Sequence, residues 1–195
     1  MCDPEDEVIE MGKLDVIVSC PFFVFDVECI GIHGECFAVA GGVYIEGAAQ
    51  HEFRFCCPAE EAEGTDDDRA WVKANIPAMK ITNRFPADVR DAFWAEWVKA
   101  KRQYPTITMA GECLWPMEAG FVSQCVSDDK GARNWGGPYP FHEIASIMLS
   151  AGMDPMKEYE RKPSEFPAHD PLADARLSAR LLATALRRLA VIEVK

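Results

Sequence analysis

The sequence lacks the cysteine and histidine patterns that would indicate a structural zinc site. Its eight cysteines contain no C-x-x-C pair, and its four histidines do not join them at the spacing of a zinc ligand set. We therefore interpret the cysteines as reduced thiols, several of them in the core.

The sequence also has no apolar run of membrane-spanning length, and its first residues are acidic where a secretory signal would be basic. We expect a cytoplasmic protein that does not bind membranes.

Cationic residues are few: the sequence has 20 Lys and Arg against 32 Asp and Glu, which gives a net charge of -12. This balance argues against a protein that coats DNA through bulk electrostatics. A phosphate-directed enzyme is still compatible with it, because bound cations invert the local field.

The length of 195 residues and the hydrophobic content of 49% predict one domain with a full-sized core. Residues 1–12 have no clear pattern and are predicted to be a frayed tail. The single domain is expected to span residues 13–195.

The strongest element signal is the apolar run Phe22-Phe23-Val24-Phe25, which continues into Asp26-Val27-Glu28. Large apolar residues without helical spacing predict a strand buried on both faces. Alternation along that strand sends Asp26 and Glu28 to the same face. Two adjacent carboxylates repel each other unless a cation lies between them, so the strand end is a candidate metal site.

The rest of the chain predicts a three-strand antiparallel meander that is followed by alternating helices and strands. Further strands are expected over 35–45, 50–56, 106–110 and 139–142, and helices over 69–75, 87–103, 117–126 and from 144 to near 152. The segment 127–138 is predicted as a loop, and 153–168 as a polar, mobile connection. Trp94 and Trp97 lie at helical spacing and are expected in the core.

The last helix has the clearest start signal in the sequence. Asp170 is expected to be the N-cap, with Pro171 at the first helical position. Asp174 lies close to the apolar stripe of this helix, so its carboxylate is predicted to point inward. An inward carboxylate needs a partner, and a metal ion is one.

The His169-x-x-x-x-Asp174 pattern, together with Asp26-x-Glu28, resembles the DEDDh exonucleases of the ribonuclease H-like superfold. The resemblance covers roughly residues 16–190 in layout. It implies an α/β fold with a central mixed sheet of about five strands that is flanked by helices.

The second motif of that family usually ends in an Asp, and this sequence departs from it. Glu118 stands at the position expected for that Asp, and Trp115-Pro116 replaces the usual residues before it. Glu112 is the rival candidate. The longer side chain of Glu puts the metal geometry in question.

The resemblance implies a metal-dependent 3'-5' exonuclease acting on single-stranded ends of RNA or DNA. Asp26, Glu28, Glu118 and Asp174 would then be ligands of two Mg²⁺ or Mn²⁺ ions, since oxygen ligands suit these ions, and His169 the general base. Related proteins place the residues after the first motif against the terminal nucleotide, which makes Gly31, Ile32 and His33 candidate substrate contacts; a surface turn is the alternative.

Trp115 is a candidate for stacking on a base, with packing in the core as the alternative. A homodimer is expected from the resemblance alone. The other hypothesis for the whole chain is a non-catalytic ribonuclease H-like module that binds a partner, which the replacement at Glu118 and the acidic composition favour.

Overall fold

A mixed sheet of five strands forms the centre of the computed structural model, which describes residues 19–192. The strands are β1 (Phe22–Cys29), β2 (Cys36–Ile45), β3 (Ala48–Cys56), β4 (Thr108–Gly111) and β5 (Phe141–Glu143). Their order is β3-β2-β1-β4-β5, with β1 to β3 antiparallel and β4 and β5 parallel to β1. The predicted meander and α/β architecture are confirmed. The predicted tail, residues 1–12, lies outside the described residues.

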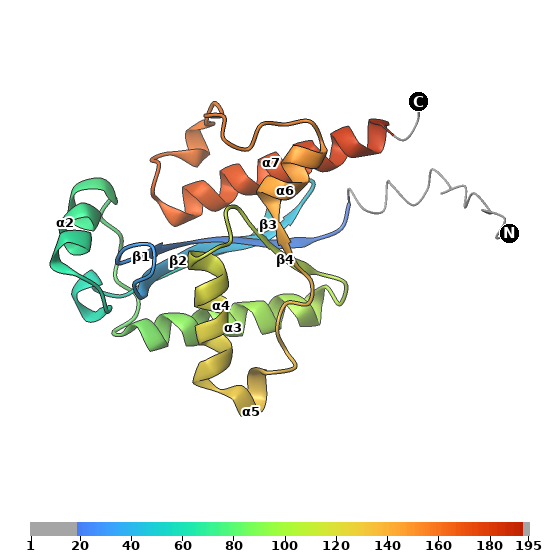
Figure 1. Ribbon diagram of the computed structural model, residues 1–195. Coiled ribbons are helices and arrows are strands. Elements are labelled where there is room, and N and C mark those ends of the chain that lie inside the picture. The colour runs from blue at the N-terminus through green and yellow to red at the C-terminus, as the bar shows by residue number, and fades with distance from the viewer. Residues whose placement is uncertain (1–18, 193–195) are drawn as a thin grey trace, which may run out of the picture.

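Helices cover both faces of the sheet, with α3 and α4 on one side and α6 and α7 on the other (Figure 1). The helices are α2 (Asp66–Asn75), α3 (Pro86–Gln103), α4 (Met117–Asp128), α5 (Lys130–Arg133), α6 (Ile144–Ser150) and α7 (Pro171–Ile192), with 3-10 turns η1 (Ala59–Glu61) and η2 (Pro163–Glu165). No helix within residues 19–192 is both long and apolar enough to cross a lipid bilayer.

The alternation of β1 divides its side chains between two apolar cores. Phe23 and Phe25 pack on the α3 side, where the rings of Phe25 and Phe93 lie 4.8 Å apart between centroids. Val24 belongs to the other core, together with buried residues of α6 and α7. Because side chains two residues apart on a strand share a face, Asp26 and Glu28 lie on the same face of β1 as Val24, toward α7.

The N-terminus of α7 is fixed to β3, the strand at one edge of the sheet. Asp170 accepts hydrogen bonds from the backbone N–H groups of Leu172 and Ala173, as expected for the predicted N-cap. Both oxygens of Asp170 also accept bonds from the guanidinium of Arg54 on β3, at 2.7 and 2.6 Å. This bidentate ion pair fixes the position of the first turn of α7 on the sheet.

Three sequence predictions differ from the structure. The predicted loop 127–138 contains α5, whose N-cap Asp129 accepts a bond from Ala132 N–H. The connection 153–168 contains η2 and carries a buried glutamate, Glu165, so it is anchored to the fold and not merely polar.

The interpretation that all cysteines are reduced thiols is wrong for Cys29 and Cys36, which form a disulfide. An irregularity after Glu28 sets these two residues opposite each other, and sequence spacing alone does not reveal that register.

Candidate active site

Two elements bring the first carboxylates of the site together. Asp26 and Glu28 lie on the face of β1 that is covered by α7, and Asp174 lies in the first turn of α7. Glu28, His169 and Asp174 each offer a ligand atom within 4.8 Å of the other two. Residues more than 140 positions apart therefore meet as the strand and helix patterns predict.

A fourth carboxylate follows directly after the end of β4. Strand β4 is parallel to β1 with Val24 opposite Ala110, and continuing this register by two residues brings Glu112 level with Asp26. Parallel strands end at the same edge of a sheet, which is why this residue reaches the site. Glu112 accepts a hydrogen bond of 2.8 Å from the hydroxyl of Ser178 on α7.

A fourth element, α4, supplies Glu118 from its first turn. The residue is 2% exposed, and its Oε2 atom is buried without a hydrogen-bond partner among the described residues. A buried carboxylate oxygen without a partner is costly, since most buried polar atoms are satisfied. Glu118 exerts the largest charge effect on Asp26 of any neighbour. The structure thus brings both Glu118 and its rival Glu112 to the site, with the unpaired oxygen on Glu118.

The turn between β4 and α4 is held by a residue that the sequence did not single out. Glu143, at the end of β5, accepts hydrogen bonds from the backbone N–H groups of Cys113 and Leu114 at 3.0 and 2.8 Å. This clamp fixes the chain just before α4 begins, and with it the position of Glu118.

Burial raises the pKa of every carboxylate in this set, and repulsion from neighbouring carboxylates adds to the rise for all of them except Asp174. We name it the acidic cluster; its members are Asp26, Glu28, Glu112, Glu118 and Asp174. Burial is the largest cause in each case. It raises the pKa of Glu28 and of Glu118 to about 8, and neighbouring carboxylates, among them Asp174 for Glu28 and Glu143 for Glu118, add to the rise. The pKa of Asp26 is raised well above its ordinary value, and that of Asp174 is raised despite a hydrogen bond from Arg161.

The donor set of the acidic cluster fits hard divalent cations. All five members offer carboxylate oxygens, the ligands preferred by Mg²⁺ and Mn²⁺. Within the described chain, Asp174 is the member that makes an ion pair, with Arg161. The unpartnered oxygen of Glu118 supplies a further donor. The carboxylates of the acidic cluster can all be ionised near neutral pH only if bound cations offset their charge.

His169 lies at the edge of the acidic cluster, exposed to solvent. Its backbone has a positive φ of 60°, and its N–H donates to Asp174 Oδ2 at 2.9 Å. Its imidazole meets the ring of Trp71 edge to face, with 5.7 Å between centroids. The histidine thus combines access to water with a position beside Glu28 and Asp174.

The predicted substrate contacts lie on exposed turns. Gly31 has a φ of 79°, and a side chain there would collide with the carboxylate of Asp68, so this turn requires glycine. Ile32 and His33 are exposed on the same turn. Trp115 is 79% exposed, so the alternative of core packing is wrong for it. Trp94 and Trp97 are buried, which confirms the prediction for them.

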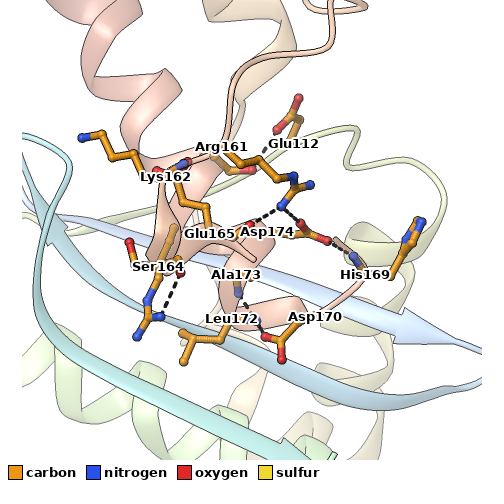
Figure 2. A network of polar contacts seen from close by, with 12 residues as sticks. Glu112, Arg161, Lys162, Ser164, Glu165, His169, Asp170, Leu172, Ala173 and Asp174 are labelled. Carbon is orange, nitrogen blue, oxygen red and sulfur yellow. Dashed lines mark hydrogen bonds and ion pairs between the residues drawn. The ribbon is translucent and has the colours of Figure 1, made fainter. Parts of the chain in front are cut away.

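Sequence reasoning missed Arg161, whose guanidinium Nη1 donates to Asp174 Oδ1 (Figure 2). This residue lies in the irregular connection before α7, where no periodicity marks one face as buried. Its position follows from tertiary contacts alone. One sequence considered alone therefore contains no pattern that marks Arg161 as a site residue.

Comparison with known proteins shows which fold this is. One solved structure that matches is S. pombe Pop2p in its Mg²⁺- and Mn²⁺-bound form, with a TM-score of 0.60 over 89% of this chain and 87% of that chain. The fold is ribonuclease H-like. The two sequences are 12% identical, so the ribonuclease H-like fold is all that the likeness establishes. No protein-family profile and no curated protein matches the sequence.

The raised pKa values predict that the metal-free protein loses stability as the pH rises. Between the ordinary value of 4.5 and the folded value of about 8, folded Glu28 and Glu118 hold protons that the unfolded chain has released. The free energy of unfolding should therefore fall by about 1.4 kcal/mol per pH unit for each such group. Thermal denaturation in EDTA from pH 5 to 8.5 measures this fall.

Glu118→Gln should make that decrease shallower, because it removes one of the two titrating groups. Glu158→Gln, at an exposed position outside the acidic cluster, is the matched control and should follow the wild type. A melting temperature that stays constant or rises over this range would show that the acidic cluster is ionised at little cost.

Proposed function

We propose that this protein is a metal-dependent 3'-5' exonuclease that hydrolyses phosphodiester bonds at single-stranded ends of RNA or DNA. The observation that carries the proposal is the convergence of five carboxylates at the end of the central strand, one of them with an unpartnered buried oxygen. The ribonuclease H-like fold and the metals bound in Pop2p support it. The order of the motifs, Asp26-x-Glu28 first and His169-x-x-x-x-Asp174 last, is the order expected of this nuclease class.

Asp26, Glu28, Glu118 and Asp174 would hold the cations. When bound, two divalent ions neutralise phosphate oxygens and favour a deprotonated water. The protein's own contribution is position: the donors come from β1, α4 and α7. Glu28 and Glu118 are buried, and Asp174 accepts hydrogen bonds from Arg161 and from the backbone of His169. Rigid elements hold such a constellation more accurately than loops do.

His169 would act as the general base. Imidazole suits this task because its ordinary pKa lies near neutrality. Its exposure lets a water molecule reach the ring, and the backbone bond to Asp174 keeps the residue beside the acidic cluster. The proton of the attacking water would pass to a ring nitrogen and from there to solvent.

The decisive experiment compares 5'-labelled RNA and DNA oligomers of one sequence, incubated with and without Mn²⁺. A 3'-5' exonuclease gives a ladder that shortens from the 3' end while the label is retained. The same reaction on a 3'-blocked oligomer controls for endonuclease cleavage. An inert protein in every arm would favour the non-catalytic, partner-binding alternative.

Asp26→Asn and Asp174→Asn should each abolish hydrolysis while the fold stays intact, because each substitution removes a metal ligand. Asp91→Asn, a surface position on α3 that pairs with Arg133, is the matched control and should retain full activity. Initial rates and circular dichroism spectra test both points. Undiminished turnover in EDTA, or by either cluster variant, would rule out the metal mechanism.

His169→Ala should lower kcat by about 10²–10⁴-fold and leave Mn²⁺ affinity unchanged, since general-base assistance is typically worth that much. His51→Ala, which removes a surface histidine paired with Glu96, should be neutral. Calorimetric titration with Mn²⁺ separates the roles. Lost metal affinity in the His169 variant would move this residue into the ligand set.

Glu118→Gln should remove most activity, whereas Glu112→Gln should leave activity nearly unchanged. The reason is that Gln at 112 still accepts the bond from Ser178, whereas Gln at 118 offers a weaker ligand in place of the unpartnered carboxylate. Glu118→Asp should lose roughly tenfold, equivalent to about 1.4 kcal/mol. The reverse ranking of the two Gln variants would assign the second motif to Glu112.

A further inference from the structure

Arg161 places a fixed positive charge at the edge of the acidic cluster. Its Nη1 donates to Asp174 Oδ1 and, at 2.8 Å, to the backbone carbonyl of Glu165 (Figure 2). Burial raises the pKa of Glu112, and the positive charge of Arg161 partly opposes this rise, so the guanidinium also lies near Glu112.

The backbone on both sides of Arg161 is anchored to α7. The carboxylate of Glu165 accepts two bonds from Arg180, at 2.6 and 2.7 Å, and one from the backbone N–H of Lys162. Arg180 also donates to the carbonyl of Glu160, the residue immediately before Arg161. The guanidinium is therefore held in place before any ligand arrives.

The guanidinium has donors to spare. Both of its hydrogen bonds use Nη1, and Nε and Nη2 have no protein partner among residues 19–192. Neither atom is buried, because Glu118 Oε2 is the one buried side-chain atom without a partner in the described chain. The free Nε and Nη2 donors form the flat edge with which arginine binds two oxygens of one phosphate.

We propose that Arg161 is a substrate-binding residue that holds a backbone phosphate of the nucleic acid against the acidic cluster through Nε and Nη2, while Nη1 stays on Asp174. The inference rests on the proposed nuclease function and names a contact for it. A chain of net charge -12 offers little general attraction for a polyanion, so a fixed cation beside the reacting phosphate matters more here than on a basic protein. The same charge opposes the negative charge that develops on the phosphate during hydrolysis.

The test compares two oligomers of the strand type that the wild type cleaves, one natural and one with a neutral methylphosphonate at its 3'-terminal linkage. Fluorescence anisotropy in Ca²⁺ gives their Kd values, and steady-state kinetics with Mn²⁺ gives KM and kcat for the natural oligomer. The wild type should bind the natural oligomer roughly tenfold to hundredfold more tightly, which is typical of a hydrogen bond between charged groups. Arg161→Gln should bind the natural oligomer more weakly, lose the part of this preference that the guanidinium contributes, and raise KM by a similar factor.

Two further variants make the result specific. Arg161→Lys keeps the charge without the flat edge, so its preference for the natural oligomer should be intermediate. Arg187→Gln makes the same charge change near Glu46, at the other end of α7, and should keep the wild-type preference. Calorimetry with Mn²⁺ alone should show that Arg161→Gln binds the metal at least as tightly as the wild type.

The outcomes separate the two proposals. If the wild type neither binds nor cleaves the oligomers, the nuclease function fails and this inference fails with it. If the wild type cleaves and Arg161→Gln retains the full preference for the natural oligomer, the phosphate contact is wrong while the function stands. Loss of Mn²⁺ affinity or of the folded state in both Arg161 variants would instead make this residue a structural counter-ion of Asp174.

Discussion

The repulsion among buried and half-buried carboxylates near the end of β1 is the constraint on which the rest of this structure depends. Folding brings five of them together and raises the pKa of each, and it leaves one oxygen of Glu118 without a partner within residues 19–192. A fold tolerates this only if the surrounding elements over-determine the positions of these groups. Such local destabilisation is characteristic of sites at which a bound cation completes the structure.

The scaffold meets this demand with separate clamps for each element of the acidic cluster. Arg54 holds the start of α7 through Asp170, and Glu143 holds the turn that leads to α4. The Cys29–Cys36 disulfide follows directly after Glu28 and joins the ends of β1 and β2. These contacts come from β2, β3 and β5, so nearly the whole sheet contributes to holding the site.

The strand and helix patterns predicted the parts of the site that local rules govern. Alternation along β1 placed Asp26 and Glu28 on one face, and the cap at Asp170 placed Asp174 in the first turn of α7, because both depend on the period of the backbone. Arg161 and the Cys29–Cys36 disulfide depend on register and on irregular chain, for which a single sequence carries no periodic signal. The sequence leaves the assignment of the second motif to Glu118 or Glu112 open for the same reason. Both residues follow β4, and their positions relative to the site depend on tertiary packing.

The central claim is that the acidic cluster holds divalent cations that its carboxylates share. The most direct measurement is anomalous diffraction at the manganese edge from crystals grown in EDTA and then soaked in Mn²⁺. The account predicts anomalous density within ligand distance of Asp26 and Glu28, with Glu118 reaching an ion directly or through water. Crystals saturated with Mn²⁺ that show no density between β1 and α7, with Glu118 still unpartnered, would contradict it.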